Sequence, residues 1–207
     1  MLSIYDIKPR FQSLLRPLTT RLAAAGITAN AVTLLAMVIS VAIGLALAVL
    51  QPAPVAFLVL PVWLFLRMAL NAIDGMLARE HGQKSTLGAY LNELTDVISD
   101  AALYLPFAFV APFGGVSVGL VIWLAAVSEM AGAIGPMVGA SRRYEGPMGK
   151  SDRAFVFGAL GLWLGLAGTL PGWLSWLMPT VAALTILNII NRVRAGLAEV
   201  HAQEHKG

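Results

Sequence analysis

The sequence predicts an all-α polytopic membrane protein with six transmembrane helices preceded by an amphipathic cytoplasmic surface helix. Of the 207 residues, 58% are hydrophobic and only 12% are charged, and the mean hydropathy is +0.77. A soluble domain of this size does not need so much apolar surface. The apolar residues are gathered in runs that are each close to the ~20 residues a bilayer core requires. The basic residues fall in every second connection between these runs.

The segment 1–25 has the pattern of a basic amphipathic helix. Its apolar residues recur every three or four positions and its basic residues lie elsewhere on the helix: Ile4, Ile7, Phe11, Leu14, Leu18 and Leu22 on the first face, and Lys8, Arg10, Arg16 and Arg21 on the second. Such a helix lies on an anionic membrane surface. We expect it to bend at Pro17.

Six long apolar runs follow and define the predicted topology. They cover residues 31–50, 54–80, 87–111, 115–141, 154–170 and 173–193. The connections at 51–53, 112–114 and 171–172 are uncharged, whereas the others carry Arg79, Lys84, Arg142, Arg143, Lys150, Arg153, Arg192, Arg194 and Lys206. Basic loops stay in the cytoplasm, which predicts a multi-pass protein of the cell (inner) membrane with both termini inside. Residues 26–197 form one six-helix transmembrane domain, and 198–207 form a cytoplasmic tail.

The stretch 71–100, NAIDGMLAREHGQKSTLGAYLNELTDVISD, places polar side chains at membrane depth. On a helix, residues 71, 74 and 78 share one face, and residues 92, 96 and 100 form a stripe at i, i+4, i+8. A turn near 81–86 makes the two helices antiparallel. Residues at equal depth are then expected to pair as Asp74 with Glu93, Asn71 with Asp96, and Arg67 with Asp100.

Two interpretations of these carboxylates are open. An ionised carboxylate at this depth costs about 2.5 kcal/mol or more, so it must be paired or face a polar cavity. Ion pairs and amide hydrogen bonds between the two helices explain Arg67 with Asp100, but they leave Asp74, Glu93 and Asp96 short of intramembrane cations. A divalent cation with oxygen ligands relieves the repulsion among converging carboxylates.

Glycines and an arginine beside the carboxylates favour a phosphate-bearing substrate. Gly75 follows Asp74, and Gly88 opens the next helix. A glycine in a transmembrane helix often serves only packing, but here it also allows a ligand to approach the backbone. Arg79 lies one turn beyond Gly75 and can contact a phosphate at the membrane surface.

These residues resemble the signature of the CDP-alcohol phosphotransferases, D-x2-D-G-x2-A-R-x8-G-x3-D-x3-D. At the same spacing this chain has Asn71, Asp74, Gly75, Ala78, Arg79, Gly88, Asn92 and Asp96, so six of the eight fixed positions agree. The first and third aspartates are asparagines here. The resemblance extends over the surface helix, the segment GITANAVT and the six-span layout.

The resemblance implies a catalytic transmembrane domain that transfers a substituted phosphate from a CDP-linked donor, usually CDP-diacylglycerol, onto an alcohol with release of CMP. It implies one or two divalent ions, Mg²⁺ or Mn²⁺, on the donor pyrophosphate. Asp96 matches the general base that activates the acceptor hydroxyl. The metal positions are Asn71, Asp74, Asn92 and Asp96, and the nucleotide positions are Asn71, Asp74, Gly75, Ala78, Arg79 and Gly88. A homodimer is expected, with a CDP-linked lipid donor, an alcohol acceptor and the bilayer as partners and no nucleic acid.

The two asparagines reduce the charge available to metals. An amide oxygen can ligate Mg²⁺ or Mn²⁺ but brings no negative charge, so a second ion would be held poorly. Glu93 or Asp100 is a candidate to supply a missing ligand, although we favour an ion pair of Asp100 with Arg67. The asparagines also motivate an alternative, a catalytically impaired relative that binds a CDP-lipid or scaffolds membrane enzymes. A small transporter is disfavoured because the polar residues cluster at one side.

Two further groups of residues are candidates for function. Arg142, Arg143, Lys150 and Arg153 lie between the fourth and fifth runs. They either only orient the spans or bind a phosphorylated acceptor or lipid headgroup, as similar family members do. Ser128 and Glu129 lie in the middle of the fourth run. A glutamate there is a functional candidate by default, and the other interpretation is a protonated packing partner.

Overall fold

The computed structural model describes residues 4–50 and 53–205, which form helices joined by short turns. The long helices are α1 (Ile4–Ala24), α2 (Ala29–Leu50), α3 (Val59–Glu80), α4 (Thr86–Tyr104), α5 (Gly115–Ile134), α6 (Lys150–Ala167) and α7 (Leu177–Glu204). Four 3-10 helices extend them: η1 (Pro54–Leu58), η2 (Leu105–Phe109), η3 (Gly135–Val138) and η4 (Gly172–Trp176). A proline stands at the start of η1, η2 and η3, where its missing N–H costs no hydrogen bond.

Each of the six predicted apolar runs overlaps one of the helices α2 to α7. In the part of the chain that the structure describes, four helical stretches are long and apolar enough to cross a membrane: Ala29–Leu50, Pro54–Glu80, Gly115–Val138 and Gly172–Glu204. The molecule is therefore a multi-pass membrane protein. Helices α4 and α6 are shorter, with 19 and 18 residues, and both carry charged residues.

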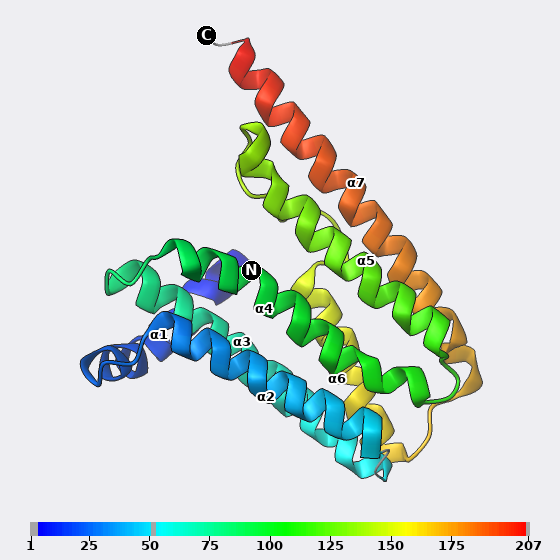
Figure 1. Ribbon diagram of the computed structural model, residues 1–207. Helices are drawn as coiled ribbons and strands as arrows, with labels where there is room; N and C mark the ends of the chain where they lie inside the picture. Colours follow the sequence, from blue (N-terminus) through cyan, green and yellow to red (C-terminus); the bar gives the residue numbers. More distant parts are fainter. Residues whose placement is uncertain (1–3, 51–52, 206–207) are drawn as a thin grey trace.

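The helices pack as two groups that meet along α4 and α5 (Figure 1). Helix α2 packs on α3 and α4, and α6 packs on α3 and η1. Helix α5 packs along α7. The turns after α4 and α6 lie at the lower right in Figure 1, whereas the α3–α4 and α5–α6 turns lie at the opposite end. This arrangement brings the polar stretch 71–100 and the basic segment 141–153 to the same end of the bundle.

The apolar core lies toward the other end. It includes the fully buried Leu60, Leu103 and Phe107, and the rings of Tyr104 and Phe157 stack with centroids 3.9 Å apart. Helices α2 and α4 approach most closely at Gly44, where a Cβ atom would lie 2.1 Å from the carbonyl oxygen of Ala102. Only glycine fits at this contact, because the obstacle is backbone.

Helix α1 packs one side against α3 and exposes apolar residues on another. Leu15 and Leu22 contact the cluster around Ile73 and Met76, whereas the exposed fraction of Leu14 is 78%. The guanidinium of Arg16 donates two hydrogen bonds to Glu80, at 2.9 and 3.0 Å. The helix continues through Pro17 as one element. The predicted face at residues 4–10 lies outside the residues whose side chains the structure describes.

The last helix extends beyond the predicted final run. The apolar run ends near residue 193, and a tail was expected from residue 198, but α7 continues to Glu204. The added residues, RAGLAEVHAQE, are mostly good helix formers, so a helix there does not depend on an apolar face.

Candidate functional site

A cavity of about 540 Å³ opens between the first turns of α2, the last turns of α3 and the start of α4. Its lining includes six of the eight motif positions: Asp74, Gly75, Ala78, Arg79, Gly88 and Asn92. Thr33, Lys84, Ser85, Glu93, Arg142 and Tyr144 complete much of the wall. We call this cavity the motif cleft.

Asp74 is the most buried carboxylate of the motif cleft. It is 6% exposed, and one oxygen accepts a hydrogen bond of 2.7 Å from the hydroxyl of Thr33 on α2. The cleft wall is close-packed at Gly88, where a Cβ atom would lie 2.9 Å from Oδ1 of Asn30 and 3.0 Å from Oγ of Ser85. Ser85 caps α4 by accepting a hydrogen bond from the backbone N–H of Gly88. Ser85, Gly88 and Ala89 at the N-terminus of α4 line the cleft, and a helix N-terminus favours an anion.

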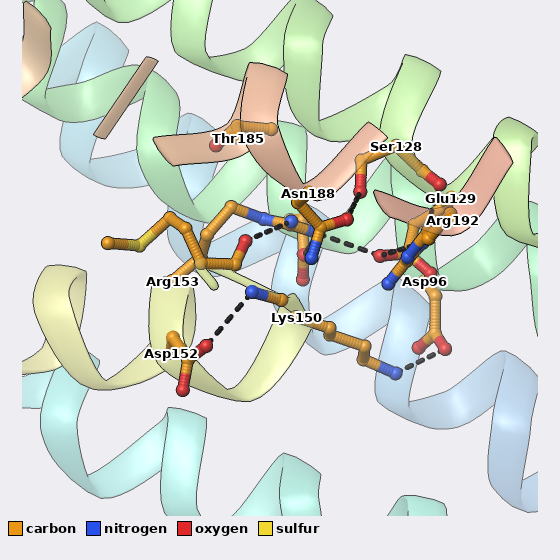
Figure 2. A network of polar contacts seen from close by, with 12 residues as sticks. Asp96, Ser128, Glu129, Lys150, Asp152, Arg153, Thr185, Asn188 and Arg192 are labelled. Atoms are coloured by element: carbon orange, nitrogen blue, oxygen red, sulfur yellow. Dashed lines mark hydrogen bonds and ion pairs between the residues drawn. The ribbon is translucent and has the colours of Figure 1, made fainter. Parts of the chain in front are cut away.

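Asp96 lies beside the cleft and is held by three neighbours. Its Oδ1 accepts hydrogen bonds from Nη2 of Arg67 at 3.1 Å and from Nδ2 of Asn71 at 3.2 Å. Its Oδ2 contacts the ammonium of Lys150, which reaches it from the start of α6 (Figure 2). Arg67 also donates to Asp100 at 2.5 Å. The expected pairs of Asn71 with Asp96 and of Arg67 with Asp100 are thus confirmed.

The expectation that these carboxylates lack cations is wrong for two of the three. Nη2 of Arg142 lies 2.5 Å from Glu93, and Lys150 contacts Asp96. Both cations come from residues that follow α5 in the sequence, so pairing α3 with α4 alone could not find them. The segment between α5 and α6 packs back against α5, and Gly132 makes room for the backbone of Arg143. A Cβ atom on Gly132 would lie 2.7 Å from the Arg143 carbonyl oxygen.

The four basic residues proposed for the acceptor do not form one pocket. Arg153 is fully buried, and Arg143 pairs with Glu145 and Glu199. The hydrogen bond that Arg143 donates to Glu145 raises the pKa of Arg143. Burial lowers the pKa of Arg142, but the hydrogen bond and charge of Glu93 outweigh it and hold that pKa above its ordinary value.

A buried polar network behind the cleft was largely missed from the sequence. Glu129 on α5 faces three arginines, so it is a paired carboxylate and not an isolated protonated group. Ser128 donates a hydrogen bond of 2.8 Å to Asn188 on α7, and Arg192 donates to the carbonyl oxygen of Ser128 (Figure 2). The charge pattern places Arg192 in the cytoplasmic connection, yet it is 3% exposed. The sequence feature that could have indicated this network is the spacing of Thr185, Asn188 and Arg192, which places them on one face of an otherwise apolar helix.

Comparison with known proteins agrees with this arrangement. Residues 26–190 match the CDP-alcohol phosphatidyltransferase family. The chain belongs to this family. It is 46% identical over 199 residues to the inner membrane protein YnbA of Escherichia coli K12, covering 95% of this chain and 97% of YnbA. As a CDP-alcohol phosphatidyltransferase family member, it is a transferase-type membrane protein of phospholipid biosynthesis.

The same fold occurs in the phosphatidylinositol phosphate synthase PgsA1 of Mycobacterium tuberculosis. Its crystal structure with bound CDP-DAG matches with a TM-score of 0.71 at 22% identity, over 87% of this chain and 92% of that one. The structure with manganese and citrate matches with a TM-score of 0.70 at 22% identity, over 87% and 88%. At this identity the likeness shows the fold.

The CDP-alcohol phosphatidyltransferase family typically uses divalent metals, and the donor atoms of the cleft fit such an ion. They are carboxylate and amide oxygens, which Mg²⁺ and Mn²⁺ prefer. Within residues 4–50 and 53–205, no three His, Asp or Glu side chains gather closely enough to hold a metal by themselves. A ligand set in this cleft would therefore have to include amide oxygens beside the carboxylates.

A second, apolar cavity begins where Arg67, Asn71 and Lys150 meet. It has a volume of about 670 Å³ and runs between α3 and α6. Its walls are mainly apolar side chains: Leu64, Phe65, Met68, Ala154, Phe155, Ala159 and Leu162. The polar end of this apolar groove thus consists of the three residues that contact Asp96.

Proposed function

We propose that this protein transfers a phosphatidyl group from a CDP-linked lipid, such as CDP-diacylglycerol, to an alcohol and releases CMP in a divalent-metal-dependent reaction. The observation that carries the proposal is the gathering of Asp74, Gly75, Ala78, Arg79, Gly88 and Asn92 on one cavity. The PgsA1 structures, one with CDP-DAG and one with manganese, support it by their shared fold.

The cytidine diphosphate is assigned to the motif cleft. Arg79 and Lys84 line it, and among the described residues neither forms an ion pair, so both are available to phosphate oxygens. The N-terminus of α4 adds backbone amides. Gly75 and Gly88 keep the walls free of side chains.

The metal is assigned to Asp74, Asp96, Asn71 and Asn92, with Glu93 as a further candidate. When bound, the ion neutralises the diphosphate and stabilises the CMP leaving group. Since two positions are amides, we propose one ion. Asp100 is left out, because Arg67 lies 2.5 Å from one of its oxygens and Arg153 lies 3.7 Å from the other.

Asp96 is proposed as the general base. Its carboxylate takes the proton of the acceptor hydroxyl while the hydroxyl oxygen forms a bond to the lipid-linked phosphorus. The bond from that phosphorus to the CMP oxygen breaks, and the electron pair leaves with CMP. Arg67 and Asn71 hold Asp96 in position, and Lys150 must release Oδ2 for the carboxylate to act as a base.

The donor's lipid chain is assigned to the groove between α3 and α6. Most of the groove lining is apolar, and its polar residues are Arg67, Asn71, Lys150 and Ser151. A diacylglycerol chain seated there keeps the adjoining phosphate near Asp96.

The proposal is tested with purified protein, CDP-diacylglycerol and a panel of alcohols by measuring CMP release. We expect turnover that is lost on chelation of divalent ions and restored by Mg²⁺ or Mn²⁺. Asp74→Asn and Asp96→Asn should each lower kcat at least 100-fold, because a metal ligand or the base is lost. Glu145→Gln removes a surface carboxylate and serves as the control. Full activity in either aspartate variant would contradict its assigned role.

The asparagines support a second candidate, a relative that binds a CDP-lipid without turning it over. Its signature is CDP binding without CMP release from any alcohol. In that case the double substitution Asn71→Asp with Asn92→Asp should restore the missing charge and produce turnover.

The membrane arrangement belongs to the same proposal. Six spans, both termini in the cytoplasm and a cytoplasmic cleft follow from the alternation of basic and neutral connections. A homodimer is proposed from the family resemblance.

A further inference from the structure

Glu129 occupies the centre of an arginine cluster. Its Oε1 lies 3.0 Å from Nη2 of Arg153 and 3.5 Å from Nη1 of Arg192, and its Oε2 lies 3.5 Å from Nη2 of Arg142. Glu129 and Arg192 are 7% and 3% exposed, and Arg153 is fully buried. Figure 2 shows Arg153 and Arg192 converging on this carboxylate.

Two of these arginines connect the cluster to the helix that carries the proposed base. Arg142 also pairs with Glu93 at 2.5 Å, and Arg153 lies 3.7 Å from Asp100. Glu93 and Asp100 lie on α4 on either side of Asp96 in the sequence. Arg142 and Glu93 also line the motif cleft, so an alcohol that enters the cleft toward Asp96 meets the cluster at Arg142.

The charges around the site are already balanced without an acceptor. Five cations, Arg67, Arg142, Lys150, Arg153 and Arg192, pair or lie with five carboxylates, Asp74, Glu93, Asp96, Asp100 and Glu129. One divalent ion then balances a diphosphate donor. A phosphorylated acceptor would add about −1.5 to −2 charges. None of these five cations is left for it, and the two unpaired cations of the motif cleft, Arg79 and Lys84, are assigned to the donor diphosphate. Burying such an unpaired charge is costly.

The cluster nevertheless retains hydrogen-bond donors. In the part of the chain that the structure describes, Nε of Arg153, Nε of Arg192 and Nδ2 of Asn188 are buried without a hydrogen-bond partner. Neutral hydroxyl oxygens can satisfy such donors without bringing charge.

We propose that the acceptor is an uncharged alcohol and that Glu129 is the residue that determines this specificity. Its carboxylate pairs with the arginines that would otherwise be free to bind the phosphate of a phosphorylated acceptor. The proposal rests on the proposed function, since it concerns the acceptor of that reaction.

The first test compares acceptors with wild-type protein, so it needs no variant. CMP release from CDP-diacylglycerol is measured with glycerol and inositol, and with glycerol phosphate and inositol phosphate, at constant ionic strength. We expect kcat/KM to be at least 10-fold higher for the uncharged alcohol of each pair. A preference of the wild-type protein for the phosphorylated alcohols would overturn the proposal.

The second test changes the charge. Glu129→Gln should shift the ratio of kcat/KM at least 10-fold toward the phosphorylated acceptor, mainly through KM, because the arginines regain free charge. Glu129→Asp keeps the charge and should retain the wild-type preference. Glu199→Gln is the matched control, since Glu199 also pairs with an arginine but lies away from the cleft. An unchanged ratio in folded Glu129→Gln protein, checked by thermal unfolding, would refute the role of Glu129.

A binding measurement separates this inference from the proposed function. Inorganic phosphate is titrated calorimetrically into metal-free protein without donor. Every sample carries Arg79→Gln and Lys84→Gln, so that the two unpaired cations of the motif cleft bind no phosphate. Saturable binding is expected when Glu129→Gln is added and not when Glu129 is intact. If no alcohol gives CMP release, the proposed function fails, and this titration still decides the charge argument: phosphate binding with Glu129 intact would overturn it.

Discussion

At the scale of single residues, the cleft depends on charges held by other charges. Arg67 illustrates this, because its guanidinium contacts both Asp96 and Asp100, and the side chains of Arg67 and Asp100 are each 4% exposed. A buried ion pair contributes little net stability, but removing one partner leaves an unpaired buried charge. The pair of Arg67 with Asp100 as a whole thus adds little to the stability of the fold, whereas the loss of either partner alone is costly.

Substitution of Arg67 tests this directly. We expect Arg67→Met to lower the free energy of unfolding by about 3 kcal/mol, because Asp100 loses its main partner. The double variant Arg67→Met with Asp100→Leu should recover most of that loss. Denaturation in detergent micelles measures both. A double variant as unstable as the single one would show that Arg67 contributes mainly by packing.

At the scale of helices, α2 and α4 pack closely against each other. These helices carry Thr33 and Asp96, and a Cβ atom at Gly44 would meet the carbonyl of Ala102. Any side chain at this position must separate the helices.

Substitution at Gly44 should therefore be costly. We expect Gly44→Ala to destabilise the protein by more than about 1 kcal/mol, although alanine is the better helix former by a similar amount. Gly119→Ala on α5 is the matched control, since a Cβ atom there would meet only open space within 4 Å, and it should be neutral or stabilising. Thermal unfolding of the two variants in one detergent makes the comparison. Equal stability would mean that α2 shifts without cost.

At the scale of the whole molecule, the sequence contains no cysteine, so single cysteines report topology without background. We expect cysteines at Gly114 and Gly172 to react with a membrane-impermeant maleimide on intact cells. Cysteines at Lys84 and Glu145 should react only after permeabilisation. Labelling of positions 114 and 145 from the same side would contradict the six-span arrangement.

Much of the fold and half of the site could be predicted from the sequence. The apolar runs located α2 to α7, and helical spacing with equal depth located the pairs of Asn71 with Asp96 and Arg67 with Asp100. The contributions of Arg142, Lys150 and Arg192 could not be predicted, since they depend on how a returning connection and a distant helix pack. The positive-inside rule counts every arginine near the end of an apolar run as a loop residue, so it places Arg192 in a connection. In the structure, the carboxylate of Glu129 pairs with Arg192 in the protein interior.

The connection between α3 and α4 is tied to the junction of α1 and α2. The side-chain oxygen of Gln83 accepts a hydrogen bond of 2.7 Å from the backbone N–H of Ala29, and Arg16 holds Glu80 on the adjoining turn. These hydrogen bonds connect the rim of the cleft to the helix with outward-facing leucines. The amphipathic pattern predicts that α1 lies on the membrane surface, and in that position it would set the height of Asp74 relative to the lipid headgroups.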